Sequence, residues 1–456
     1  MEKKRGSFSG GIGFVLAAAG SAVGLGNLWR FPYLAAQYGG GIFILTYIVL
    51  ALTFGFALLT TEIAIGRKTG LSPVMAYKKL SKKFSFVGIL AVIVPVIIMP
   101  YYCVIGGWVT KYVAVYAEGL FNQGMVSTAA GEGFFGGFIG NPNAPLVFFL
   151  VFLMITVLVV MCGVEKGIER LSKFLMPILL VLTVGIAIYV MTLPNALDGV
   201  KYYLVPDFSK FSFSTIAAAA SQLFYSMSLA MGIMITYGSY TKKEVSIVKS
   251  VNRIEIFDTS IAMLAGLMVI PAVYAFSGEA GLAANGPGLM FQALPGVFNQ
   301  MPFGGIIGLL FFVLVFFAAL TSSISIMEAI VSSIMDKFHL SRFKSGLIVI
   351  GICLLLGIPS SLGNGLWANI KVIGMDFLTF FDFLSNSVLM PIVAFFTCIL
   401  VGWIVKTKTI TDEVTLNGER FKRKGLYEVM VKYVAPVVLV MILVTGILSG
   451  FGIIKI

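Results

Sequence analysis

The chain has 456 residues, of which 59% are hydrophobic and only 11% are charged. A soluble globular domain carries about 25% charged residues, so this composition excludes an ordinary soluble protein and indicates many membrane-spanning segments. The net charge of +12 is typical of nucleic-acid-binding proteins as well, but the basic residues of this chain follow a membrane topology instead.

Eleven long apolar segments follow one another along the chain. About 20 apolar residues are needed for a helix to cross a bilayer, and a helix satisfies its own backbone groups in hydrocarbon. The sequence therefore predicts an all-α polytopic membrane protein with one membrane domain over residues 1–456. The predicted spans are residues 11–36, 40–66, 86–117, 144–162, 168–192, 214–240, 246–276, 303–335, 344–359, 375–405 and 429–450.

The basic residues cluster in alternate loops. If the N-terminus is cytoplasmic, all but six of the 32 Lys and Arg residues lie on the cytoplasmic side of the membrane. Because cytoplasmic loops are enriched in Lys and Arg, we expect a multi-pass protein of the plasma membrane with a cytoplasmic N-terminus. Eleven spans then place the C-terminus outside. The positive charge reflects this topology and predicts no nucleic-acid partner.

Spans one and six share an irregularity near the middle of each apolar segment. Residues 20–32 read GSAVGLGNLWRFP, and residues 226–232 read SMSLAMG. Gly and Asn are poor helix formers, and unwinding there would free backbone NH and C=O groups that bind ions and a polar solute. Close helix packing is an equally good explanation for any single glycine. It does not explain why Asn27 and Arg30 accompany the glycines at membrane depth.

The two interruptions lie five spans apart. Since five is odd, the two segments cross the bilayer in opposite directions. Paired interrupted helices in inverted repeats are typical of the binding site of a secondary transporter. We therefore expect two inverted five-helix repeats, at about 8–192 and 212–405, with unwound helices 1 and 6 and an extra helix at about 429–450.

Several polar side chains are predicted at membrane depth, where ionisable groups are costly and favour functional roles. Asp258, in IEIFDTSIAMLAG, predicts a sodium ion or a buried partner, and Glu62, in LLTTEIAIG, is expected to bind free backbone NH groups. Thr321 and Ser322 of span eight have two interpretations. Their hydroxyls bond either to the preceding turn of their own helix or, with carbonyls of span one, form an oxygen cage for a hard cation.

Four segments resemble the neurotransmitter:sodium symporter family: GSAVGLGNLWRFPYLAAQYGGG, PYYCVIGGW, SQLFYSMSLAMGIMITYGSY and FFAALTSSISIM. The resemblance extends from Arg5 to about span eleven. Members of this family usually have twelve spans, whereas eleven are predicted here. The resemblance therefore indicates a bacterial eleven-span member, similar to the bacterial leucine and multi-hydrophobic amino acid transporters. It implies a sodium-coupled symporter that imports a neutral hydrophobic L-amino acid by alternating access. A proton-coupled amino-acid permease and a non-translocating amino-acid sensor remain alternatives.

The resemblance also implies two sodium sites and a substrate site. The first sodium site comprises Ala22, Asn27, Ser226 and Asp258, together with the substrate carboxylate. The second comprises Gly20, Val23, Ala318, Thr321 and Ser322. The implied substrate contacts are Ala22, Leu25, Gly26, Ile98, Tyr102, Tyr225, Ser226, Ser228, Met231, Ser322 and Ile326.

Gates and three further positions follow from the same resemblance. Gly24 stands where amine transporters of the family have an aspartate, and Ala230 where many bacterial members have glycine. Asp258 lies next to the position of a bound chloride in animal members, so its carboxylate implies transport without a chloride requirement. The implied gates are Arg30 with Asp382 on the outside and Arg5 with Asp336, near Tyr240, on the inside.

No sequence feature indicates an enzyme. The chain shows neither a nucleophile with a base nor a cluster of metal ligands. The four cysteines lie in apolar segments without CxxC spacing, which is typical of small core residues rather than of a disulfide or a metal site. They are Cys103, Cys162, Cys353 and Cys398.

Overall fold

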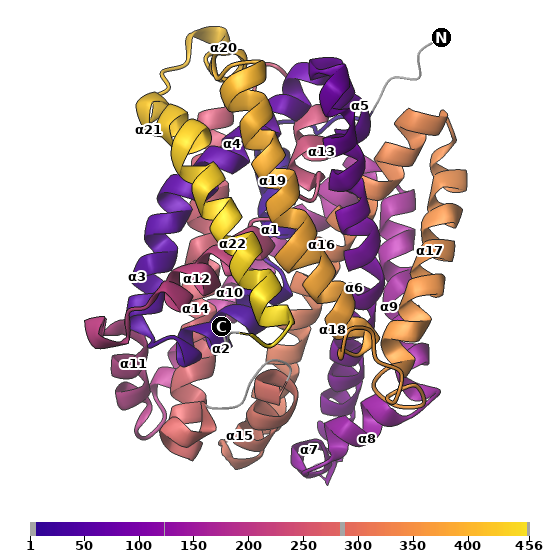
Figure 1. The fold of residues 1–456 in the computed structure, drawn as a ribbon. Helices are drawn as coiled ribbons and strands as arrows, with labels where there is room; N and C mark the ends of the chain where they lie inside the picture. Colours follow the sequence, from indigo (N-terminus) through magenta and orange to yellow (C-terminus); the bar gives the residue numbers. More distant parts are fainter. Residues whose placement is uncertain (1–5, 123, 283–287, 454–456) are drawn as a thin grey trace.

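The computed structural model describes residues 6–122, 124–282 and 288–453. Within these ranges the regular secondary structure is helical, apart from two isolated bridge pairs, Gly40 with Pro206 and Val372 with Met375. The helices stand side by side in one bundle (Figure 1), which confirms the predicted all-α membrane fold.

The long helices follow the predicted spans closely, and several change to wider π-type turns along their length. They are α1 (Gly11–Ala22), η1 (Gly26–Arg30) and α2 (Phe31–Gln37); α3 (Gly41–Leu50), η2 (Ala51–Gly55) and α4 (Phe56–Thr69); α6 (Ser85–Gly119); α9 (Ala144–Met161); η4 (Val164–Glu169) and α10 (Arg170–Met191); α12 (Phe213–Ser226) and α13 (Ile233–Ser239); α14 (Ile247–Gly281); α16 (Gly304–Phe338); α17 (Arg342–Leu362); α18 (Phe377–Asp382), η7 (Phe383–Leu389), α19 (Met390–Ile399) and η8 (Leu400–Ile404); and α21 (Lys424–Val429), η10 (Met430–Val434) and α22 (Ala435–Gly450).

Shorter helices connect the spans. They are α5 (Pro73–Leu80), η3 (Lys82–Phe84), α7 (Gly124–Ala130), α8 (Phe134–Gly140), α11 (Ala196–Leu204), η5 (Phe208–Lys210), η6 (Leu289–Ala293), α15 (Leu294–Gln300), α20 (Lys408–Val414) and η9 (Leu416–Gly418).

Nine helices in the described part of the chain are long and apolar enough to cross a bilayer, and a bent pair, Gly11–Ala22 with Gly26–Gln37, makes ten. α12 and α13 flank residues 227–232 at the place of the predicted sixth span. Counted together they would complete the eleven. The count of eleven and the inverted repeats remain predictions.

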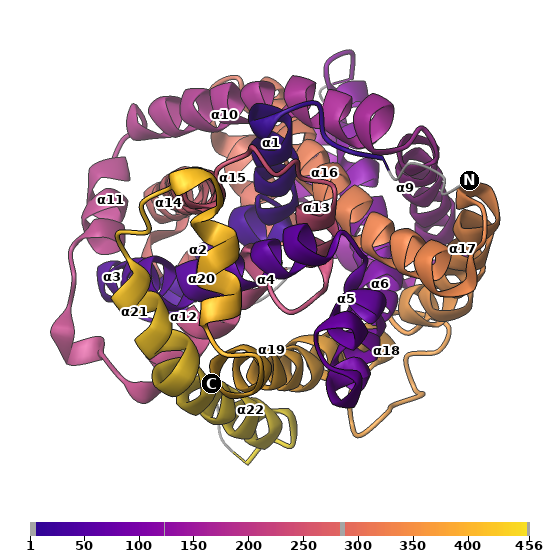
Figure 2. The same cartoon turned by 90° about the horizontal axis from the view of Figure 1, so that it is seen from above.

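The two interrupted segments lie inside the bundle. Seen from above, α1 and α13 lie within a ring whose outer edge includes α9, α17 and α22 (Figure 2). α13 packs against α4, and α16 packs against α6. Apolar side chains on the rim face outward, and two of them, Leu355 and Val181, are 71% and 70% exposed. A bilayer accommodates such a surface, so the polar groups of α1 and α13 are enclosed by protein rather than by lipid.

The charged stretch between the last two predicted spans contains a short helix, α20, whose Ile410, Glu413 and Val414 are buried. Apolar packing and the ion pairs of Glu413 hold this helix against the bundle.

The prediction that the four cysteines are core residues is wrong for Cys162, which is exposed where α9 ends. The other three cysteines are buried as predicted.

Candidate functional site

The break predicted in span one is present. α1 ends at Ala22, and the following helix, Gly26–Gln37, departs at an angle of 48°. The buried Val23 has an extended backbone with ψ of 93°. The side-chain oxygen of Asn27 accepts a hydrogen bond of 3.3 Å from the NH of Gly24. Asn27 therefore satisfies a backbone group that the break releases, as polar side chains do at helix ends.

The break predicted in span six lies opposite. α12 ends at Ser226 and α13 begins at Ile233. Between them Ser228, Ala230 and Gly232 adopt left-handed φ angles of 52°, 59° and 67°. This conformation costs a residue with a side chain about 1–2 kcal/mol, so neighbouring groups must hold the segment in place.

Two side chains from neighbouring segments bind the freed backbone. The carboxylate of Glu62 accepts a hydrogen bond of 2.6 Å from the NH of Ala230, as predicted from its sequence context. The side-chain amide of Gln222 donates a hydrogen bond of 2.8 Å to the carbonyl of Gly26. Gln222 was not predicted as a site residue, although it is the one glutamine of the predicted sixth span. At each break, a polar side chain from outside the broken segment therefore binds a backbone group.

Asp258 lies at the centre of a buried polar cluster. Its Oδ1 accepts hydrogen bonds of 2.8 Å from Asn27 Nδ2 and 2.7 Å from Ser226 Oγ. Its Oδ2 accepts one of 3.0 Å from the hydroxyl of Tyr47. Because an unpaired carboxylate is very costly in an apolar interior, these donors account for its complete burial. Tyr47 was missed, since one tyrosine in an apolar span carries no signal of its own.

The hydroxyls of span eight divide between the two predicted interpretations. Ser322 Oγ reaches α1 and donates to the carbonyls of Ser21, at 3.0 Å, and Gly20, at 3.4 Å. Thr321 Oγ1 bonds within its own helix, including the carbonyl of Ala318 at 3.1 Å. α1 and α16 therefore bring hydroxyl and carbonyl oxygens together, which is the ligand chemistry that hard cations prefer.

A small cavity lies between the two breaks. Its volume is about 20 Å³, enough for about one water molecule. Every predicted substrate contact except Ser226 lines it, and Ser226 binds Asp258 instead. The lining residues are Ser21, Ala22, Gly24, Leu25, Gly26, Ile98, Tyr102, Tyr225, Ser228, Met231, Ser322 and Ile326.

One wall of the cavity is closely packed around Gly24. A β-carbon at this position would lie 2.4 Å from Ser322 Oγ and 2.9 Å from the hydroxyl of Tyr102. The NH of Leu25 donates a hydrogen bond of 3.3 Å to the same Tyr102 hydroxyl. The backbone of the first break and Tyr102 thus form a polar end of the cavity, with no room for a side chain at Gly24.

The predicted outer gate is not a direct ion pair in this conformation. Arg30 Nη2 donates a hydrogen bond of 3.0 Å to Ser221 Oγ, and the guanidinium lies over the ring of Tyr225, 5.6 Å from its centre. Asp382 accepts hydrogen bonds from Asn386, at 2.6 Å, and from a tyrosine of α6. Arg30 and Asp382 thus each form hydrogen bonds with other neighbouring polar groups instead of with each other.

The predicted inner gate includes Arg5, which lies outside the described residues. Asp336 accepts a hydrogen bond of 2.8 Å from the NH of Ser72. Tyr240 donates one of 2.6 Å to Glu328, a buried carboxylate that also forms an ion pair of 2.6 Å with Arg342. The pair of Glu328 and Arg342 was not predicted from the sequence, because its partners meet only in the folded bundle.

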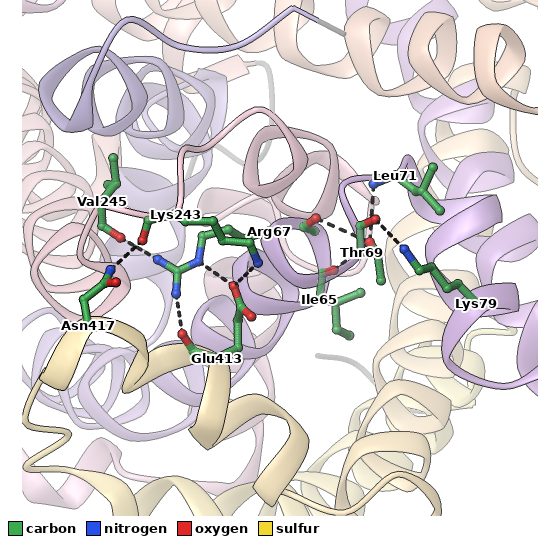
Figure 3. A network of polar contacts seen from close by, with 10 residues as sticks. Ile65, Arg67, Thr69, Leu71, Lys79, Lys243, Val245, Glu413 and Asn417 are labelled. Atoms are coloured by element: carbon green, nitrogen blue, oxygen red, sulfur yellow. Dashed lines mark hydrogen bonds and ion pairs between the residues drawn. The ribbon is translucent and has the colours of Figure 1, made fainter. Parts of the chain in front are cut away.

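A second buried ion pair fastens α20 to the same end of the bundle (Figure 3). Arg67 Nε lies 2.8 Å from Glu413 Oε1, and Arg67 Nη1 donates a hydrogen bond of 2.5 Å to the carbonyl of Val245. Lys243 Nζ contacts the same Glu413 oxygen at 2.8 Å. Arg67, at the end of α4, therefore joins α20 to the segment between α13 and α14.

A model of the sodium:neurotransmitter symporter family matches residues 5–120 and 135–451 of the chain. The chain belongs to this family. It is 35% identical to an uncharacterized sodium-dependent transporter of Bacillus subtilis, over 98% of this chain and 99% of that protein. It is 32% identical to an uncharacterized sodium-dependent transporter of Haemophilus influenzae, over 97% of this chain and 98% of that protein. The human sodium- and chloride-dependent GABA transporter 2 is 25% identical, over 91% of this chain and 76% of its own length.

A solved structure of a symporter has the same fold. The crystal structure of MhsT in complex with L-phenylalanine matches with a TM-score of 0.88 and 35% identity, over 97% of this chain and 100% of that one. The resemblance predicted from the sequence is confirmed. This symporter is a sodium-dependent, multi-pass membrane transporter and not an enzyme.

The ion pairs around Glu413 predict different effects for its two partners. Arg67 is 1% exposed and Lys243 is 50% exposed. Removing one partner of a buried pair costs about 3 kcal/mol or more, whereas an exposed pair contributes about 1 kcal/mol or less. We expect Arg67→Ala to lower the thermal unfolding temperature of the purified symporter clearly more than Lys243→Ala, measured in the same detergent. Equal effects would contradict this assignment.

Proposed function

We propose that this symporter imports a neutral, hydrophobic L-amino acid together with sodium by alternating access. The observation that carries the proposal is the composition of the cavity between the two breaks. Apolar side chains and Tyr, Ser and backbone groups line it, and none of these lining residues is acidic or basic. Such walls favour a ligand with an apolar side chain, while freed backbone NH groups favour a carboxylate.

The similarity to MhsT, solved with L-phenylalanine, supports the same substrate class. The close packing around Gly24 is also consistent with it. Gly24 has no side chain, and a side chain there would have to displace Ser322 or Tyr102. The protein therefore supplies no acidic group at this position that could take the place of the substrate carboxylate. The cavity must widen to hold an aromatic side chain, and Met231, which has a flexible side chain, lies in its wall.

We propose two sodium sites. The first joins the carbonyl of Ala22 with Asn27, Ser226 and Asp258, and the hydrogen bonds among the last three support it. The second joins carbonyls of Gly20, Val23 and Ala318 with the hydroxyls of Thr321 and Ser322, and the contacts between α1 and α16 support it.

The gates and the topology complete the proposal. Arg30 and Asp382 approach each other when the outer side closes, and Arg5 and Asp336 hold the inner side near Tyr240. The N-terminus is cytoplasmic and the C-terminus extracellular in the plasma membrane, as the distribution of basic residues indicates. The helices form inverted repeats over about 8–192 and 212–405, with an additional helix at about 429–450.

The sodium site between α1 and α16 predicts the effect of removing its hydroxyls. Thr321→Ala with Ser322→Ala should weaken sodium activation of amino-acid uptake into proteoliposomes by about tenfold or more, which corresponds to about 1.4 kcal/mol. Ser323→Ala is the matched control, because Ser323 Oγ bonds to Leu320 and faces Thr156 instead of α1. Wild-type activation in the double variant would mean that the site is misplaced.

The same assay separates the alternatives. A proton-coupled permease takes up substrate without sodium when a proton gradient is imposed, and a sensor binds substrate without accumulating it. Either result with the wild-type protein would end the proposal of sodium symport.

The apolar walls predict the order of substrates. In competition binding, leucine, methionine, tyrosine, phenylalanine and tryptophan should rank above lysine, glutamate and glycine. Burying an unpaired charge costs several kcal/mol, so charged side chains should be rejected strongly. Phenethylamine, which lacks the carboxylate of phenylalanine, is the control for the polar end of the cavity. Preferential binding of lysine or of this amine would overturn the assignment.

Asp258 predicts uptake that requires sodium but not chloride. Two cations held close together repel each other by several kcal/mol even at an effective dielectric constant of about 20, so they need a nearby negative charge. The carboxylate of Asp258 supplies it in the protein itself, in contrast to a relative named as chloride-dependent. Replacing chloride by gluconate on both sides should leave wild-type uptake unchanged, whereas Asp258→Asn should be slower or gain halide dependence. A wild-type protein that stalls without chloride would contradict this role.

A further inference from the structure

A second, larger cavity lies at the end of the bundle that we propose to be cytoplasmic. Its volume is about 480 Å³. It lies between the start of α14 and the segment that joins α20 to α21, and Figure 2 shows these helices as neighbours. The lining residues are Phe56, Ser246, Val248, Lys249, Asn252, Glu419, Arg420, Phe421, Lys422 and Arg423. Four of these side chains are basic and one is acidic.

The positive charge of this cavity is only partly balanced. Arg423 Nη2 forms an ion pair of 3.0 Å with Glu255, and its guanidinium lies on the ring of Phe56. Lys249, Arg420 and Lys422 are exposed, and their side chains form no hydrogen bond or ion pair within the described residues. Three cations around one cavity attract an anion, and the N-terminus of α14 adds the positive end of a helix dipole.

The cavity is held in shape by contacts across it. Ser246 Oγ donates a hydrogen bond of 2.6 Å to Glu419, which satisfies the one acidic group of the lining. Asn417 Nδ2 donates one of 2.7 Å to the carbonyl of Lys243. The buried pair of Arg67 and Glu413 fixes the preceding helix α20 (Figure 3). These contacts hold the segments that carry the basic side chains, which lowers the entropy cost of ordering them when a ligand binds.

The cavity borders the lipid-facing surface of the bundle. Arg423 Nη1 donates a hydrogen bond of 3.1 Å to the carbonyl of Leu52, whose apolar side chain is 48% exposed. On α14, Ile256 is 64% exposed and lies seven residues after Lys249, about 10 Å along a helix. The basic side chains of the cavity match the headgroup of a phospholipid, and the exposed apolar side chains beside them match its acyl chains.

We propose that this cavity binds the headgroup of an anionic phospholipid. The phosphate contacts Lys249, Arg420 and Lys422, and the acyl chains lie along Leu52 and Ile256. Basic pockets at the cytoplasmic ends of transmembrane helices are suited to anionic headgroups. The adjoining apolar surface favours a lipid over a soluble phosphate, which has no apolar part to place there.

The test compares phosphatidylglycerol with phosphatidylcholine on the purified full-length symporter, by titration in detergent and native mass spectrometry. The wild type should bind phosphatidylglycerol at least fivefold more tightly than phosphatidylcholine. Lys249→Gln with Lys422→Gln should remove this preference, and Lys422→Gln alone should reduce it. The control is Lys82→Gln with Lys83→Gln, which removes two exposed lysines of η3 that do not line the cavity and should keep the preference.

Four outcomes would overturn the proposal, and three of them concern the comparison of the two lipids. The wild type could bind both lipids equally, the variant of Lys249 and Lys422 could keep the full preference, or the control could lose it equally. Soluble glycerol 1-phosphate distinguishes the source of the phosphate. If it competes as tightly as phosphatidylglycerol, the cavity binds a soluble anion and the assignment to a lipid is wrong. Binding is measured without substrate or sodium, so the result is independent of the proposed transport function.

Discussion

The constraint on which this structure depends is the need to satisfy backbone groups that two broken helices release inside a membrane. Hydrocarbon offers no hydrogen bonds, so each released group must find a partner in the protein. Glu62 binds the NH of Ala230, Gln222 binds the carbonyl of Gly26, and Ser322 binds carbonyls of α1. These contacts come from separate helices, and together they place α4, α12 and α16 around the breaks.

The same contacts divide the centre of the protein into two environments. On one side, Asp258 collects donors from three segments and concentrates negative charge next to the first break. On the other side, the cavity has apolar walls and a polar end formed by Leu25 and Tyr102. In the function that we propose, a cation and a carboxylate-bearing ligand with an apolar side chain bind within one short stretch of backbone. We propose that this proximity couples the binding of one to the binding of the other.

The two ends of the bundle are built differently in this conformation. The end that we propose to be cytoplasmic carries two ion pairs with buried carboxylates, Glu328 with Arg342 and Glu413 with Arg67, both reinforced by hydrogen bonds. At the end that we propose to be extracellular, Arg30 contacts Ser221 and Tyr225 rather than Asp382. Buried pairs are costly to separate, whereas partly exposed contacts exchange readily with water. The end that contains Arg30 thus has the weaker contacts to break.

Much of the architecture is determined locally by the sequence. Apolar runs of about 20 residues specify membrane helices, and Gly24, Gly26 and Asn27 weaken the helix where it breaks. Asp258 and Glu62 lie within apolar segments, which indicates that each carboxylate needs a hydrogen-bond donor or a cation nearby. Glu62 accepts the backbone hydrogen bond expected for it. Which side chains complete the site is decided only by the tertiary structure. Tyr47 and Gln222 lie far from Asp258 and Gly26 in sequence, and Arg67 meets Glu413 across 346 positions. Periodicity and propensity act over a few residues, whereas these contacts arise because packing brings distant helices together.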